Sequence, residues 1–598
     1  MKKILLSITF ALMGIVSGFA AKAYSGIVTV TQSDGTELNV RIYGDEHFNW
    51  LTTEDGVLLV QEGNNYYIAE TTSYGTLKAT SFIAHNANKR LPAEIKAIKK
   101  QDLSRFRSYA IQKASPAKAM GTGNSGVKYF PHSGSPKALV ILVEFSDTPF
   151  QSGEKAKNVF EHFLKGKDEN NLPDGYEAYT GSYKNKNNLR NKGSVSDYFY
   201  DMSKGTYTPQ FDVVGPYKLN QPSLYYGKGE NDNTYALVSD ACKAADKDVD
   251  FSQYDADGDG MVDLVYIIYA GYPASMSGNP NDIWPKSGPG NDSFGTYDGK
   301  KVCRYGVHAE LNFGRELNQK NGFLLSGIGL FCHEFSHTLG LPDLYPTVDA
   351  SKVDNQNPEM WDLMDGGEYT YNGGYCPTPY SPWEMDVMGW ATPVELSDEK
   401  QTVTLKSYGK ERIAYKIKGE NNEYLLLQNI QIGGWWTGVA YVYNTGMLVW
   451  RIDYNNKDVN LFDNPNNTIG KPKVMIVPAD GYVISDYNHG DGKQWTDAEY
   501  KSSLQGDPFP GKGNITQLLS VTLNNSTLEK PIYNIKEENG VITFDYLDNI
   551  SAIQLPSVDE TDMTTKQIFS LDGRYLGNDA SKLTKGIYII GKKKVVIK

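Results

Sequence analysis

Apolar runs and turn residues divide the chain into regions of different pattern. From residue 24 to about 67, short β-rich runs alternate with Asp–Gly and Gly–Asn turns, which predicts a small β meander. Beyond Trp390 the chain has short strand runs, among them EYLLLQNIQIGGWW and GMLVWRIDY, separated by Gly, Asn and Pro clusters. That spacing is typical of an all-β sandwich.

The middle of the chain alternates strands with helices. Lys137–Asp147 and Val262–Gly271 are continuous apolar runs of the buried-strand type. Between them, GSVSDYFYDMSKG has a helical pattern with Ser194 or Ser196 as its N-cap. An α/β unit is therefore predicted from about residue 127 to 395.

A chain of 598 residues is too long for one core, so a multidomain protein is expected. The small-residue stretch ASPAKAMGTGNSG is typical of a linker. The predicted segments are an export signal at 1–23, a β-rich region with its linker at 24–126, an α/β (α+β) domain at 127–395, a β-sandwich-like all-β domain at 396–550 and a tail at 551–598.

Composition and charge exclude several classes of protein. With 40% hydrophobic and 22% charged residues the chain is predicted to be soluble and globular, and a net charge of −12 gives no basic surface for nucleic acid.

The N-terminus has the layout of a secretory signal peptide, with two lysines, an apolar run from Ile4 to about Val16 and small residues up to Ala23. That run is shorter than the ~20 residues of a membrane span. Export without an integral membrane span is predicted. The four cysteines match no zinc knuckle and leave three disulfide pairings open.

The stretch LFCHEFSHTLGLPDLY holds two of the eight histidines of the chain. His333 and His337 lie four positions apart, so on a helix their imidazoles project from one face and can share a tetrahedral zinc ion. Glu334 would then lie beside the ion as general base for a water molecule. Gly340 ends the helix where a positive φ is useful. Asp343 follows as the natural third ligand.

A helix that carries two histidines by chance is the plainer explanation. With eight histidines in 598 residues, the pattern arises by chance about once in a hundred such chains, and here the helical context, the turn glycine and an oxygen ligand accompany it. Zinc binding is therefore predicted. The third ligand stays open, because another acidic residue or water could replace Asp343.

The same stretch resembles the extended HExxHxxGxxH/D signature of metzincin metallopeptidases. It is most similar to the immune inhibitor A-like branch of secreted bacterial peptidases, in which LPD follows the glycine. Further stretches resemble this branch in order over about 136–545: LVILVEFSD, DADGDGMVDLVYIIYAG, MWDLMDGG, SPWEMDVMGW, EYLLLQNIQ and GDPFPGKG. The resemblance implies a metzincin-like zinc metallopeptidase domain at 127–395 and a pro-segment at 24–126, and hence a zymogen.

The resemblance also implies roles for single residues. Met364 would be the Met-turn residue beneath the metal, with an ordinary core methionine as the alternative. Tyr369 or Tyr371 would supply a hydroxyl to the transition state. The pro-segment has no cysteine to ligate zinc, which leaves Asp45 as a blocking ligand or as a turn residue after Gly44.

A second metal site is predicted in DADGDGMVD, which has carboxylates at positions 1, 3, 5 and 9 of an EF-hand-like loop. The calcium ligands would be Asp255, Asp257, Asp259, Asp263 and, through its backbone carbonyl, Met261. Position 12 is Tyr266 in place of glutamate, so the loop is no true EF-hand. Four carboxylates this close repel one another unless a cation lies among them, which favours a structural calcium ion over a solvated acidic turn.

The C-terminal stretch LDGRYLG…LTKGIYIIGKKKVVIK resembles the sorting tail of type IX secretion cargo in Bacteroidetes-type bacteria. The resemblance implies contact with secretion machinery and delivery to the cell surface or the medium, and a plain β hairpin is the alternative.

The predicted function is a secreted zinc-dependent endopeptidase that hydrolyses extracellular proteins or peptides, with a zinc-activated water and Glu334 as general base. The alternative is a cell-surface adhesin or glycan-binding protein with a non-catalytic zinc site, favoured by the 41 tyrosines and the β-rich region. A non-peptidase zinc hydrolase is a third interpretation, because ligand sets do not determine the substrate. Substrate, processing sites and oligomeric state are left open.

Overall fold

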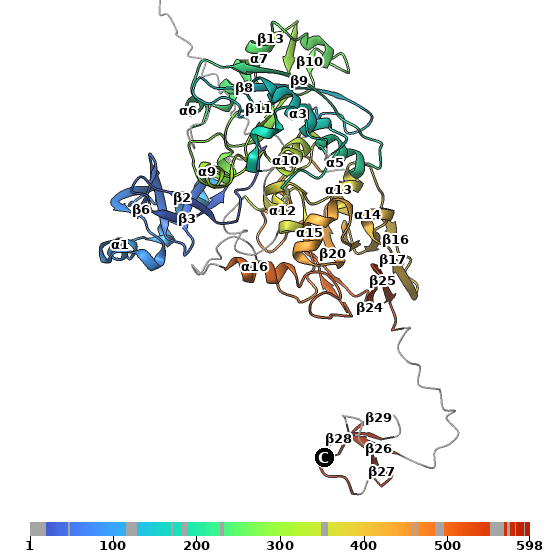
Figure 1. Ribbon diagram of the computed structural model, residues 1–598. Helices are drawn as coiled ribbons and strands as arrows, with labels where there is room; N and C mark the ends of the chain where they lie inside the picture. Colours follow the sequence, from blue (N-terminus) through green and yellow to red (C-terminus); the bar gives the residue numbers. More distant parts are fainter. Residues whose placement is uncertain are drawn as a thin grey trace, which may run out of the picture. The chain divides into compact units, whose positions relative to one another are not determined.

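The computed structural model describes most of the chain (Figure 1). The described residues are 19–45, 48–114, 128–168, 171–181, 189–227, 233–347, 357–456, 459–461, 463–484, 495–549, 567–570, 575–579, 582–590 and 593–597. The chain divides into one unit over Met1–Asp548 and another over Asn549–Lys598. Residues 1–18 of the predicted signal peptide and the predicted linker from 115 onward lie outside the described residues.

A mixed β-sheet forms the centre of the first unit. Its strands are β1 (Phe19–Ala20), β8 (Lys137–Glu144), β9 (Gln210–Lys218), β11 (Val265–Tyr269), β12 (Lys286–Pro289) and β15 (Arg304–Ala309), in the order β1-β12-β15-β11-β8-β9. Strands β8, β9, β11 and β15 pair in parallel, whereas β12 runs antiparallel to β15. The two predicted buried runs are thus neighbouring central strands, which confirms the α/β prediction.

Helices cover both faces of this sheet, as Figure 1 shows. The longer helices of the region are α3 (Ala156–Lys165), α5 (Val195–Met202), α7 (Thr234–Ala245), α9 (Arg315–Asn321), α10 (Ile328–Thr338) and α13 (Pro382–Val387). Along β8, Val140 and Leu142 join a core with α3, α5 and α10, whereas Ile141 and Val143 join a core with α7. Because successive strand residues point to opposite faces, a strand covered on both sides has to be apolar throughout. The predicted cap is also confirmed, since the Ser194 hydroxyl accepts a hydrogen bond from the Asp197 amide.

The N-terminal region forms an antiparallel meander that extends beyond the predicted end at residue 67. Its strands follow chain order: β2 (Val28–Thr31), β3 (Glu37–Gly44), β4 (Asn49–Thr53), β5 (Leu58–Glu62), β6 (Asn65–Thr71) and β7 (Leu77–Ile83). Two helices follow, α1 (Pro92–Ile98) and α2 (Leu103–Ala114). Val28 and Val40 of the meander share a buried cluster with Ala274 and Trp284 of the central region. The meander is therefore packed onto the central region.

The region after Trp390 forms two stacked sheets, as the strand pattern predicts. One contains β16 (Val394–Glu395), β18 (Tyr415–Lys418), β19 (Glu423–Ile430), β20 (Gly446–Asp453) and β21 (Val474–Ile476), and the other contains β17 (Gln401–Leu405), β24 (Ile532–Glu538) and β25 (Val541–Tyr546). Leu425 and Val449 face the second sheet. On the opposite face, Leu426 and Leu448 join the core that contains α10. The sandwich thus shares a core with the α/β region.

Shorter elements lie between these. They include β10 (Met261–Val262), β13 (Thr296–Tyr297), β14 (Lys300–Val302), α6 (Ser223–Tyr226), α8 (Ala274–Ser277), α12 (Thr370–Gly374), α14 (Tyr408–Glu411), α15 (Thr437–Tyr443), α16 (Asp497–Leu504), β22 (Val521–Thr522) and β23 (Thr527–Leu528).

The second unit is a small antiparallel sheet. Its strands are β26 (Ile568–Ser570), β27 (Tyr575–Gly577), β28 (Gly586–Ile590) and β29 (Lys593–Ile597), in the order β27-β26-β28-β29. The KGIYII run and the basic terminal run pair as neighbouring strands.

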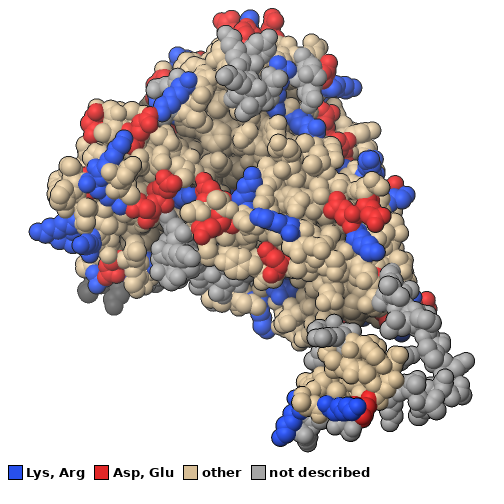
Figure 2. Space-filling model, turned by 60° about the horizontal axis from the view of Figure 1, so that its bottom comes forward, with Lys and Arg blue, Asp and Glu red and all other residues tan. Residues whose placement is uncertain are grey.

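The charge distribution on the surface and the length of the helices bear on the expectation that the chain has no nucleic-acid partner and no membrane span. On the face drawn in Figure 2, acidic and basic side chains are interspersed over the surface. Within the described ranges, every helix is too short or too polar to cross a membrane.

Candidate metal centre and active site

Helix α10 carries the central part of the predicted motif into the interior of the protein. His333, Glu334 and His337 are each fully buried. The opposite side of the helix is held by aromatic contacts, with the rings of Phe331 and Tyr266 stacked at a centroid distance of 4.1 Å. The helix ends before Gly340, whose φ of +107° confirms the predicted left-handed turn.

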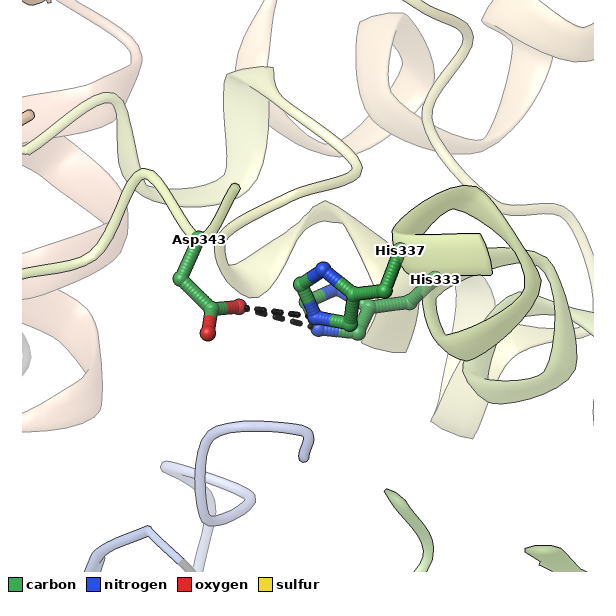
Figure 3. Close-up of side chains that lie close together, drawn as sticks. All are labelled: His333, His337 and Asp343. Atoms are coloured by element: carbon green, nitrogen blue, oxygen red, sulfur yellow. Dashed lines mark ion pairs between the residues drawn. The ribbon is translucent and has the colours of Figure 1, made fainter. Parts of the chain in front are cut away.

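The turn brings Asp343 back onto the two histidines (Figure 3). Its Oδ1 atom lies 3.3 Å from His333 Nε2 and 3.2 Å from His337 Nε2. Ligands about 2.0–2.1 Å from a tetrahedrally coordinated zinc ion are about 3.3 Å apart, so these separations match the edges of such a tetrahedron. Two imidazoles and one carboxylate are a donor set that suits zinc. The residues present therefore fit the metal that the sequence predicts.

Backbone carbonyls orient both imidazoles. His333 Nδ1 lies 2.8 Å from the Leu363 carbonyl oxygen, and His337 Nδ1 lies 2.7 Å from that of Leu341. A proton on each Nδ1 makes these hydrogen bonds and leaves each Nε2 lone pair facing Asp343. Met364, the predicted Met-turn residue, is buried directly after Leu363. The structure thus places Met364 beside the carbonyl that orients His333.

Burial and charge act differently on the two carboxylates of the site. Burial raises the pKa of Asp343, but His337 and His333 outweigh burial and lower that pKa to about 2. Burial raises the pKa of Glu334 to about 8 despite the opposing effect of His337. Asp343 is therefore the more acidic of the two carboxyl groups, and Glu334 is the more basic.

A segment that the sequence analysis did not connect with the site lies against Glu334. The Ala21 amide donates a hydrogen bond of 2.6 Å to Glu334 Oε1. Just before it, Phe19 and Ala20 pair antiparallel with Ser287 and Lys286 of the edge strand β12. The only sequence signal in this segment was its run of small residues, which was interpreted as the end of a signal peptide.

Two further side chains hold the segment in place. Trp284 Nε1 donates to the Ala21 carbonyl at 2.9 Å, and the Tyr369 hydroxyl donates to the Lys22 carbonyl. Asp45, the predicted blocking residue, instead accepts a hydrogen bond of 3.2 Å from the Phe48 amide within its own turn. The contact with Glu334 comes from Ala21. Tyr371, the other predicted tyrosine, is about one-third exposed.

The acidic loop also forms a cluster. Asp255, Asp257 and Asp259 each have a carboxylate oxygen within 4.8 Å of the others, whereas Asp263 accepts from the Ala256 amide and the Met261 amide donates to Asp259. The ammonium group of Lys128 contacts Asp257 and Asp259, and that of Lys300 lies 2.7 Å from Asp255. The counter-charge that the sequence argument assigned to calcium is thus supplied in part by two lysines, and calcium stays a prediction.

The four cysteines are free thiols, and Cys332 is buried beside His333. Burial raises its pKa well above the usual value, so it remains a neutral thiol. Its side chain belongs to the apolar core that also contains Phe331 and Phe335 of α10.

Comparison with known proteins agrees with this geometry. Residues 128–391 match the family model described as immune inhibitor A peptidase M6, catalytic domain. The chain is 27% identical over 320 residues to Immune inhibitor A of Bacillus thuringiensis subsp. alesti, covering 44% of this chain and 42% of that protein. It is 24% identical over 280 residues to Pre-pro-metalloprotease PrtV of Vibrio cholerae serotype O1 (strain M66-2), covering 41% of this chain and 29% of that protein.

The chain thus spans less than half the length of these relatives. The matched region includes the helix with both histidines, Glu334 and Asp343. Residues 128–391 are thus similar to the catalytic domain of the immune inhibitor A peptidases.

Proposed function

We propose that this protein is a secreted, zinc-dependent endopeptidase in which His333, His337 and Asp343 hold the metal and Glu334 is the general base. The observation that carries the proposal is the convergence of both Nε2 atoms on Asp343 Oδ1 at 3.3 and 3.2 Å, one residue away from a buried glutamate. This arrangement favours an enzyme over the adhesin alternative, because a purely structural site has no need of a base beside the metal.

The roles of the residues follow from their positions. When bound, zinc supplies Lewis-acid chemistry that lowers the pKa of water toward ~7 and stabilises negative charge on the substrate oxygen. Glu334 takes the proton as water attacks the scissile carbonyl and then returns it to the leaving amine. The Leu363 and Leu341 carbonyls hold the imidazoles in the tautomer that ligates metal.

The contacts of the N-terminal segment support synthesis as a zymogen. Ala21 lies on the catalytic glutamate while Phe19 and Ala20 fill the edge of β12, so a substrate cannot reach either group until this segment leaves. The meander that follows packs on the central region through Val28 and Val40, which keeps the segment in place. Loss of residues 19–23 with the signal peptide and of residues 24–126 as a pro-segment would expose the site.

Export is supported by the signal-peptide layout of residues 1–23, and the C-terminal sheet is consistent with a sorting tail recognised by secretion machinery. Deletion of Gly586–Lys598 should trap the protein inside the cell. Normal release of the shortened protein would refute this part of the proposal.

The function is tested with casein and with Glu334→Gln. The exported protein should hydrolyse casein, a zinc chelator should abolish this, and the variant should keep one zinc ion per chain while losing nearly all activity. Glu399→Gln, which alters an exposed carboxylate in the β-rich region, is the matched control. Full activity of pure, zinc-loaded Glu334→Gln protein would overturn the assignment of the base.

A further inference from the structure

We propose that the cleft selects peptides that carry a lysine or arginine at the second position after the scissile bond, and that Glu359 and Asp365 form the pocket for this side chain. The inference rests on the proposed peptidase function and names its substrate class. It comes from the way the N-terminal segment of this chain occupies the cleft, with Lys22 as the side chain that enters the pocket.

The segment is bound as an extended peptide. Phe19 and Ala20 extend the central sheet by pairing antiparallel with β12, which is the way that a peptide adds to an exposed sheet edge. The next carbonyls are fixed by side chains, that of Ala21 by Trp284 and that of Lys22 by Tyr369. Main-chain recognition of this kind leaves specificity to pockets for individual side chains.

The hydrogen bond to Glu334 sets the register. A general base that returns its proton to the leaving amine has to lie within hydrogen-bond distance of that nitrogen. The nitrogen that meets this condition belongs to Ala21, at 2.6 Å from Glu334 Oε1. The Ala20–Ala21 bond therefore occupies the position of the scissile bond, and Lys22 is the second residue after it.

The Lys22 side chain enters a buried acidic pocket. Its Nζ atom lies 2.8 Å from Asp365 Oδ1 and 3.3 Å from Glu359 Oε2. The side chains of Lys22 and Glu359 are 2% exposed and that of Asp365 is 0% exposed, so solvent hardly screens these charges. A neutral side chain in the same place would remove the ammonium group that both buried carboxylates contact, which is unfavourable.

The pocket is built by the enzyme body and not by the segment that fills it. Asp365 Oδ2 accepts from the Asn357 amide side chain at 3.0 Å and from the Glu359 backbone amide at 2.7 Å. Glu359 Oε2 accepts from the Tyr500 hydroxyl at 2.8 Å. All of these groups lie outside residues 24–126, so the pocket persists when that region is removed.

The surroundings of the pocket have room for a longer peptide. Next to the pocket, the Ala21 side chain is buried against Met276 and Leu330. This site therefore accepts a small side chain at the first position after the scissile bond. Beyond Lys22, a cavity of about 410 Å³ is lined by residues that include Tyr24 and Met360. A small residue followed by a basic one is therefore the expected pattern.

The test uses the exported protein, which has lost residues 1–23 and is loaded with zinc, together with fluorogenic peptides that contain Phe-Ala-Ala-Xaa-Ala-Tyr with Xaa as Lys, Arg, Met or Glu. Mass spectrometry should place the cut between the two alanines. The kcat/KM for the Lys and Arg peptides should exceed that for the Met peptide by about tenfold or more, because a neutral side chain cannot form the ion pairs with the two buried carboxylates. The Glu peptide should be the poorest substrate.

The pocket variants separate recognition from chemistry. Glu359→Gln and Asp365→Asn should each lower the ratio of kcat/KM for the Lys peptide to that for the Met peptide, whereas Glu399→Gln should leave both values unchanged. Equal cleavage of the Lys and Met peptides by the unaltered protein, or a cut at another bond, would overturn this inference and leave the peptidase intact. If neither casein nor any peptide is cleaved, the proposed function itself fails.

Discussion

Replacement of Glu310 by glutamine should change how the stability of the central region depends on pH. Glu310 directly follows β15 and is fully buried. Its carboxylate accepts hydrogen bonds from the Tyr179 hydroxyl at 2.7 Å, the Gln151 amide at 2.7 Å and the Gly271 amide at 3.2 Å. Burial raises its pKa from 4.5 to about 7, although these three donors oppose the increase.

The raised pKa has a defined effect on the free energy of unfolding. Because the folded state keeps the Glu310 proton to a higher pH than the unfolded chain does, this contribution is fully present below pH 4.5 and is lost as the pH rises to about 7. A difference of about 2.5 pKa units corresponds to a loss of about 3 kcal/mol. Glutamine has the same shape, carries no ionisable proton and should not show this loss.

The assay is urea unfolding of both proteins, followed by tryptophan fluorescence, at several pH values from 4 to 8. The stability of Glu310→Gln relative to the unaltered protein should rise by about 3 kcal/mol between pH 4.5 and 8. Burial also raises the pKa of Asp362 to about 7, so it titrates in the same range, but it does so in both proteins and cancels in the comparison. Parallel pH profiles for the two proteins would refute the reasoning.

Three further predictions concern the metals and the N-terminal segment. Asp343→Ala should weaken zinc binding by more than about a hundredfold in a chelator competition, and an unchanged affinity would assign the third ligand elsewhere. Calcium should raise the melting temperature and a chelator should reverse the increase; no shift would leave Lys128 and Lys300 as the counter-charges of the acidic loop. In a precursor that keeps residues 1–23, Lys22→Met should increase casein hydrolysis, because losing the ion pairs of Lys22 with two buried carboxylates costs roughly 3–5 kcal/mol of segment docking; unchanged hydrolysis by this precursor would contradict the prediction.

Local pattern was sufficient for much of the fold and for the metal-binding group. The histidines on α10, the turn at Gly340 and the return of Asp343 involve residues within ten positions of one another, and helix geometry relates them directly. The buried strands were equally readable, because β8 and β11 need apolar residues on both faces. The cap at Ser194 follows from the hydrogen-bonding needs of a helix start.

Contacts between distant residues could not be predicted in this way. Ala21 and Glu334 are 313 positions apart, and an alanine carries no chemical signal of its own. Lys128 and Lys300 reach the acidic loop from separate segments, so the charge argument from the loop alone was incomplete. The sequence also could not show whether residues 396–550 fold separately. That depends on which elements cover each face of β19, and the apolar residues of the strand do not identify their partners.

The two-faced packing of β19 and β20 means that the protein cannot be reduced to its catalytic region. Leu426, Leu448 and Trp450 complete the core against which helix α10 packs. A fragment that ends at residue 395 would expose this apolar surface and lose support behind the histidines. The β-rich region therefore acts as an internal scaffold for helix α10, and a change in its core would first affect the positions of the histidines on that helix.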